Sequence, residues 1–541
     1  MKTNRRPLDK ALTPRRAEPY GYHKVDLRPR VPRSTDLNHQ SLRSRAIAVA
    51  LLLLASLLPS SRAAEPKPDA ATKLLYSANG LFNRGLYELA AEEYQKFLKA
   101  HPNHAGADQA RYALGISLHN LNKPREAAAE FERLTRKTNF KHAAEVHALL
   151  GQARLALGEH DAAAKAFRWV LDNRADSDMA DDAVAGLAET ALARENWQEA
   201  AKEYERLLEK WAESPLAERA RFQAAIARFR LGEYEPAREH LETFLKTYRD
   251  SPLAQQAHVL IGDTWRETGK PDRAILHYDA ARRMEGEFRN EALLGLAIAQ
   301  FQMGQFDAGR KTAEALRKAA PESPLLRTAE LYRARSYLNL DRPQDAEPIL
   351  SELEQKSDSV SDDAAYWRAR ALMKMNQPAE AEQALRRATA AFPKSNVRAE
   401  MVFDLAAALM AQEKFADAAA AYDRVVAEFA KHALAEEAQY LAAFAFHRAG
   451  RYDESSKRAT AFLAAHAKSR FADSAALVLG ENFFLQKQYD QAEKQYRSVI
   501  GQYPKSPAAE KAQFRIGVVL HARKQFDQAA RELAPDRKSV V

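Results

Sequence analysis

The chain contains no cysteine among its 541 residues. This absence excludes disulfide bonds, thiolate metal sites, a cysteine nucleophile and a lipid-modified N-terminal cysteine. Hydrophobic residues make up 46% of the chain and aromatic residues 9%. The composition is therefore sufficient for a sizeable apolar core.

The chain also lacks an excess of charge outside its N-terminal leader. The formal net charge is +9, but residues 1–45 hold 12 Lys/Arg against 4 Asp/Glu, and Arg62 adds one more positive charge. Residues 64–541 are consequently neutral overall. Because nucleic-acid binding depends on positive charge that neutralises phosphates, we expect no nucleic-acid partner.

No apolar run is long enough to cross a bilayer, which takes about 20 residues. The longest run extends from Ala46 to Leu58, after Arg43, and small residues follow it up to Ala63. This pattern is typical of a secretory signal, with its apolar segment and cleavage site in residues 46–63. A buried helix or a membrane anchor is the alternative. Residues 1–45 are then a basic leader, either disordered or upstream of the true start, and 64–72 are a spacer.

No catalytic or metal-binding pattern stands out. The 15 histidines include no His-Glu-x-x-His, and neither a glycine-rich phosphate loop nor a Gly-x-Ser-x-Gly elbow is present. The acidic pairs at 181–182 and 362–363 fall at expected helix starts, where the helix dipole favours carboxylates, and we expect them to be solvated. We therefore predict no catalytic residue, no cofactor and no metal.

A repeat of 35 to 37 residues runs through most of the chain. Each repeat contains one reference residue, which gives the register of the others. The thirteen reference residues are Tyr87, Pro124, His160, Trp197, Tyr234, Pro271, Phe306, Pro343, Pro378, Phe415, Tyr452, Tyr489 and Phe526.

Three other positions of the repeat are restricted. The residue nine before the reference residue is Gly or Ala in all thirteen repeats, and the third residue after it is Ala in eleven. The seventh residue after it is Tyr or Phe in seven repeats and Leu in four. We predict two helices per repeat that cross closely at the small residues, with the aromatic ring filling the space between one hairpin and the next.

Residues that favour turns lie between the helices. Six glycines and two asparagines stand two residues before the reference residue, where a left-handed conformation is expected. Four Ser-Pro pairs, beginning at Ser214, Ser251, Ser323 and Ser506, are expected to open the next helix.

The Gly/Ala, Tyr-x-x-Ala and Tyr/Phe spacing, followed by a turn with proline, resembles the tetratricopeptide repeat. Long links such as "YPKSPAAEKAQFRIG" are similar to those of periplasmic repeat proteins of the Tol–Pal system and of outer-membrane assembly. The resemblance implies an all-α fold, a right-handed α-solenoid of about 13 antiparallel helix pairs over residues 73–535. Shorter spacings around 282–290 and 354–363 are expected to be loop shortenings, with a change in superhelix curvature or a soft joint as the alternative. Residues 536–541 do not resemble the repeat, and we expect the natural chain to continue beyond about residue 535.

In the resembled family the first helix of each repeat lines a concave surface. The residues twelve, eight and five before the reference residue would then be exposed in a groove for an extended or helical peptide; the alternative is that neighbouring repeats cover them. The candidate residues are Tyr112, Phe222, Ile226, Phe229, Ile298, Phe301, Tyr366, Phe403, Tyr440, Phe444, His447, Phe484 and Phe514.

These observations predict a non-catalytic scaffold of the periplasm or cell envelope that binds protein or peptide partners. It would meet a membrane only through envelope complexes or an uncleaved signal. Two other functions remain open, a self-assembling structural component of an envelope complex and an accessory subunit of an envelope enzyme.

Overall fold

The computed structural model describes residues 69–137, 139–356, 358 and 360–533. All regular secondary structure in these residues is helical and comprises 26 helices, α3 to α28. The leader 1–45, the segment 46–63, most of the spacer and the tail 536–541 lie outside the described residues. The first helix of the first repeat begins at Ala70, three residues before the predicted start of the repeats.

The chain divides into two compact units, with the boundary between Ala299 and Gln300. The N-terminal unit contains α3 (Ala70–Asn83), α4 (Tyr87–Ala100), α5 (Ala107–Asn120), α6 (Pro124–Thr135), α7 (Ala143–Ala156), α8 (His160–Asn173), α9 (Ala180–Ala193), α10 (Trp197–Lys210), α11 (Ala217–Arg230), α12 (Tyr234–Thr247), α13 (Ala254–Glu267) and α14 (Pro271–Arg283). The boundary lies within α15 (Arg289–Gln302).

The C-terminal unit continues from the end of α15 through α16 (Phe306–Ala319), α17 (Leu326–Asn339), α18 (Pro343–Glu354), α19 (Ser361–Lys374), α20 (Pro378–Ala391), α21 (Arg398–Ala411), α22 (Phe415–Glu428), α23 (Ala435–Arg448), α24 (Tyr452–Ala465), α25 (Ala472–Leu485), α26 (Tyr489–Gln502), α27 (Pro507–Ala522) and α28 (Phe526–Leu533).

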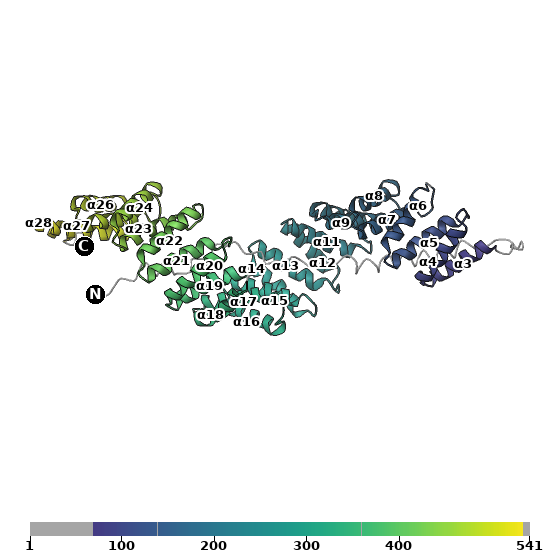
Figure 1. Cartoon of the computed structure of the whole chain (residues 1–541), viewed down its shortest axis with the longest axis horizontal. Helices are drawn as coiled ribbons and strands as arrows, with labels where there is room; N and C mark the ends of the chain where they lie inside the picture. The colour runs from purple at the N-terminus through teal and green to yellow at the C-terminus, as the bar shows by residue number, and fades with distance from the viewer. Residues whose placement is uncertain (1–68, 138, 357, 359, 534–541) are drawn as a thin grey trace. The chain divides into compact units, whose positions relative to one another are not determined.

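The helices form the predicted hairpins. Each of the thirteen reference residues is the first residue of the second helix of its hairpin, from Tyr87 in α4 to Phe526 in α28. Within each unit the helices follow one another in chain order, and each packs on the next (Figure 1). First helices of successive hairpins also contact one another, as α5 and α7 do in one unit and α25 and α27 in the other. The fold is therefore an α-solenoid, as the sequence predicted.

The turn inside each hairpin has one geometry throughout. All thirteen residues two before the reference residue have positive φ, between 71° and 77° at the six glycines and between 55° and 62° at the others. The next residue donates its amide to a carbonyl five residues earlier, as Lys414 does to Leu409 at 3.0 Å. This hydrogen bond closes a Schellman motif. Glu195, Asp341, Glu413, Lys487 and Lys524 adopt the left-handed conformation without being Gly or Asn, which the sequence analysis did not predict.

The links between hairpins correct the Ser-Pro prediction. Only Ser506 caps its helix, accepting the amide of Ala509 in the first turn of α27. At Ser214 the hydroxyl accepts the amide of Leu216 at 3.1 Å, and α11 begins at Ala217. Ser251 and Ser323 likewise accept the amide two residues on. In these three links the proline lies inside a turn that precedes the helix.

The small residues have the predicted mechanical role. A Cβ built on Gly151 would lie 2.6 Å from the Phe167 ring of the same hairpin, and one on Gly186 of the next hairpin would lie 2.3 Å from it. The Phe167 ring, which has no exposed surface, is thus enclosed between two glycines. Tyr278 is enclosed in the same way by Gly262 and Gly295.

The two shorter spacings have different origins. Five residues separate Arg283 of α14 from Arg289 of α15, and α14 has 13 residues where most helices have 14. The link between α18 and α19 has six residues, as most links do, and the shortening lies in α18 itself, which has 12 residues; the expected loop shortening is therefore wrong there. Their predicted role as soft joints stays a prediction.

Candidate functional site

The predicted groove residues lie on first helices, but six of the thirteen are buried. Their exposed fractions are between 0% and 7%, and they are Tyr112, Phe222, Ile226, Ile298, Tyr366 and Phe403. The expected exposure is wrong for these six side chains. The reason is visible at Phe222, whose ring packs 5.5 Å from that of Phe244 in the second helix of its own hairpin and belongs to the core.

Six more candidates are half-buried against neighbouring rings or polar groups. Phe229 packs edge-on against Tyr234 at 5.5 Å, and Tyr440 stacks on Phe471 at 5.3 Å. His447 makes a 2.7 Å hydrogen bond through Nδ1 with the Asn482 side chain of the next first helix. The remaining three are Phe301, Phe444 and Phe484. These side chains present only part of their surface.

Phe514 alone among the thirteen is exposed, at 59%. It lines a groove of about 530 Å³ between α25 and α27, together with Leu477, Glu481, Glu510, Lys511 and Arg515. Leu477 and Phe514 both stand twelve residues before their reference residues. The groove therefore occupies the register that the sequence analysis assigned to partner binding, although binding by these residues stays a prediction.

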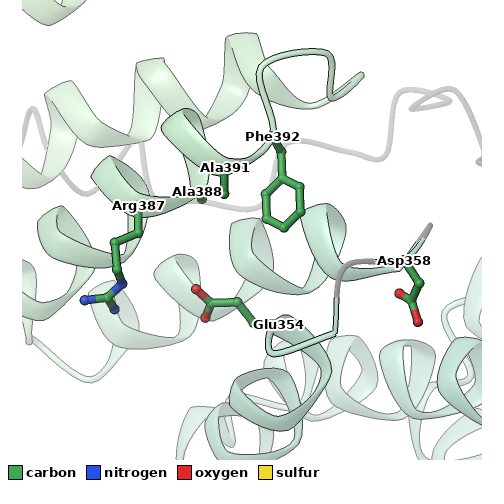
Figure 2. Close-up of a pocket in the computed structure, with 6 residues that line it drawn as sticks. All are labelled: Glu354, Asp358, Arg387, Ala388, Ala391 and Phe392. Carbon is green, nitrogen blue, oxygen red and sulfur yellow. The ribbon is translucent and has the colours of Figure 1, made fainter.

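A second cavity of about 350 Å³ lies at the link between α18 and α19 (Figure 2). Glu354, Asp358, Arg387 and Phe392 line it, along with two alanines of α20. Glu354 accepts from Arg368 at 2.8 Å, and Asp358 accepts from Arg327 at 3.0 Å. Because the chain's own arginines already hold both carboxylates, this cavity offers a ligand no unpaired acid.

The first helices of the C-terminal unit also carry an arginine surrounded by aromatic rings, which sequence reasoning missed. The Arg335 guanidinium carbon of α17 lies 4.7 Å from the Phe301 ring centroid, 4.9 Å from that of Tyr332 and 4.7 Å from that of Trp367. Its Nε atom is buried and has no hydrogen-bond acceptor among the described residues. The available signal was an arginine eight before the reference residue in two successive repeats, Arg335 and Arg370.

A carboxyl group is buried between the two helices of one hairpin in the N-terminal unit. Asp263 of α13 is 1% exposed and accepts a 2.6 Å hydrogen bond from the Tyr278 hydroxyl of α14. Arg266 lies 3.5 Å from the same carboxylate. Burial raises the pKa of the Asp263 carboxyl to about 6, although Arg266 and Tyr278 favour the charged form. The arrangement links two helices of one hairpin.

The acidic pairs lie in the first turns of α9 and α19, as predicted. The expectation that they are solvated is wrong for Asp181, Asp182 and Asp362, which are 6% to 9% exposed. Asp181 accepts a 2.6 Å hydrogen bond from the Ser214 hydroxyl. Ser214 belongs to the link between α10 and α11, which therefore lies against the start of α9.

The described residues include no group of three His, Asp or Glu side chains placed to hold a metal ion. None of their helices has the length and apolarity needed to span a membrane.

Family models match most of the repeat region. Three tetratricopeptide models match, one at residues 75–141, 112–180 and 403–456, one at 266–335 and 337–402, and one, described as a tetratricopeptide repeat-like domain, at 430–540. A model described as "Outer membrane lipoprotein" matches residues 177–285. No curated protein matches the chain.

Solved structures that are similar to the chain include three helical repeat proteins. A tetratricopeptide repeat protein from Parabacteroides merdae is 13% identical with a TM-score of 0.34, covering 48% of this chain and 96% of its own. The APC/C hetero-tetramer Cut9-Hcn1 is 10% identical with a TM-score of 0.34, and the match covers 88% of this chain and 99% of the Cut9-Hcn1 chain. The apo form of RapI is 14% identical with a TM-score of 0.40, and the match covers 60% of this chain and 98% of the RapI chain. At these TM-scores the three structures carry no argument about the function of the chain.

Proposed function

Because the chain belongs to the tetratricopeptide-repeat family, we propose that it is a non-catalytic scaffold of the cell envelope that binds protein or peptide partners on its first helices. The observation that carries the proposal is the groove between α25 and α27, where Phe514 is 59% exposed at a register position that the sequence predicts to bind partners. Exposed aromatic side chains in a concave, partly apolar groove favour binding of a peptide segment.

The envelope assignment rests on two supports. The chain matches the outer membrane lipoprotein model over residues 177–285, and residues 46–63 have the composition of a secretory signal.

The proposal is tested by site-specific photocross-linking of the full chain in its host. A photoreactive phenylalanine analogue replaces either Phe514 of α27 or Tyr76 of α3, which are exposed at 59% and 56% on first helices. The matched controls carry it at Leu276 of α14 or Leu89 of α4, which are exposed at 64% and 50% on second helices.

We expect discrete protein adducts from the first-helix positions in the periplasmic or envelope fraction, and none from the second-helix positions. Equal adducts from both sets, or adducts from second helices alone, would contradict binding on the first helices. Recovery of the whole protein in the cytoplasmic fraction would contradict the envelope assignment.

A further inference from the structure

The guanidinium of Arg335 is held in place without an opposite charge. Three rings lie within 5 Å of its central carbon, and it forms no ion pair with any described residue. Aromatic rings attract a guanidinium but do not neutralise its charge or accept its in-plane N–H donors in the way a carboxylate does. Arg335 is half-buried, so that part of the side chain remains accessible.

The neighbouring repeat shows what the same register normally holds. Arg370 stands eight residues before its reference residue, as Arg335 does, and lies 5.2 Å from the Trp367 ring. Its guanidinium lies 3.8 Å from the carboxylate of Asp404, on the next first helix. Asp404 stands eleven residues before its reference residue, so that these two positions face each other across successive first helices.

The pairing recurs with the charges exchanged. Glu481 of α25 stands eight residues before its reference residue, and Arg515 of α27 stands eleven before its own; their side chains lie 2.6 Å apart. Opposite Arg335, the position eleven before the next reference residue holds Trp367. Its ring packs on the guanidinium but supplies no negative charge. The repeat therefore places a carboxylate opposite Arg370 and an aromatic ring opposite Arg335.

From this difference we propose that Arg335 binds a side-chain carboxylate of an acidic peptide segment in a partner protein, lying along α17 and α19. The inference rests on the proposed function, because it specifies the chemistry of a partner bound on the first helices. The rings restrict the rotation of the guanidinium before binding, and its weak hydration lowers the cost of desolvation. Charge-assisted hydrogen bonds to the carboxylate then add specificity for Asp or Glu over Asn or Gln.

The test is selection of random peptides by the immobilised full chain. In one library the peptide C-terminus is fused to its carrier, and in the other it is free. Peptides selected from the fused library should carry Asp or Glu at one fixed position. For a selected peptide we expect about 10- to 100-fold weaker binding when that residue is replaced by its amide or when the chain carries Arg335→Met.

Two further variants distinguish a contact from general damage to the fold. Trp367→Asp supplies the facing carboxylate that Asp404 supplies to Arg370, and it should weaken the same peptide without loss of helical circular dichroism. Arg317→Met makes the same change in charge at an exposed arginine of the second helix α16 and should leave binding unchanged.

The outcomes separate this inference from the proposed function. Peptides that bind the first helices with no acidic position, or with equal affinity for the Arg335→Met variant, would overturn the inference and leave the proposed function standing. Enrichment from the free-terminus library alone would overturn it in favour of a terminal carboxylate. Failure to select any peptide from either library would count against both.

Discussion

The enclosure of Phe167 makes a sharp prediction about the substitution Gly186→Ala. The added Cβ would lie 2.3 Å, 2.4 Å and 2.6 Å from three atoms of the ring, and Gly151 closes the opposite side. Overpacking costs about 1–3 kcal/mol, and a ring enclosed on both sides favours the upper part of that range. Replacing a helical glycine by alanine gains about 1 kcal/mol. The net expectation is a loss of about 1–2 kcal/mol in the local free energy of unfolding.

The assay is amide hydrogen exchange of the full chain, followed by mass spectrometry of peptides from α8 and α9, because units of a repeat protein open locally. A loss of about 1–2 kcal/mol accelerates their exchange about 5- to 30-fold. Gly80→Ala is the matched control: Gly80 lies inside α3 with no atom within 4 Å of its Cβ position. There the same substitution should slow local exchange, since only the helix propensity changes.

A second variant tests whether the ring is the cause. In the Phe167→Leu background, where the residue is narrower, the effect of Gly186→Ala should fall by at least about 0.5 kcal/mol. The enclosure argument is refuted if Gly186→Ala and Gly80→Ala shift the local exchange rate in the same direction. It is also refuted if Gly186→Ala has the same effect in the Phe167→Leu background as in the unaltered chain.

Three other predictions follow from the turns, the buried acid and the groove. Glu413 has a φ of 59°, a left-handed conformation that is strained for a residue with a Cβ. Glu413→Gly should relieve this strain and stabilise the α21–α22 hairpin by about 0.5–1 kcal/mol, which slower amide hydrogen exchange would show; faster exchange would contradict it. The raised pKa of Asp263, about 6 against 3.8, means that the folded state binds this proton more tightly than the unfolded state, so stability falls as the pH rises from about 4 to 6. Asp263→Asn should therefore stabilise the protein at pH 7.5 by up to about 3 kcal/mol and by much less at pH 4, measured by urea unfolding; equal gains at both pH values would contradict it. Phe222→Ser should destabilise its hairpin by at least about 3 kcal/mol because Phe222 is fully buried, whereas Phe514→Ser should stay within about 0.5 kcal/mol; similar losses in thermal denaturation would contradict the difference in burial.

The sequence was sufficient to predict the fold and most of its local detail. The period of 35 to 37 residues located each hairpin, and the first residue of every second helix coincides with a reference residue. Local chemistry explains this success, because turn residues and helical periodicity act within one repeat. Eight of the thirteen left-handed residues were identifiable as Gly or Asn, but Glu413 and Lys487 were not, since the Schellman hydrogen bonds impose the conformation on whatever residue occupies the position.

Tertiary structure decided which of the candidate side chains a partner can reach. Phe222 and Phe514 share the same register and the same residue type, yet one has no exposed surface and the other is 59% exposed. Likewise Arg335 and Arg370 look alike in sequence, and only the facing helix shows that Asp404 lies near one while Trp367 contacts the other. A repeat pattern fixes how a residue is oriented on its own helix. Exposure depends on packing within the hairpin and against the next one, as at Phe222, and charge pairing depends on the facing helix of the next repeat; only the structure brings these residues together.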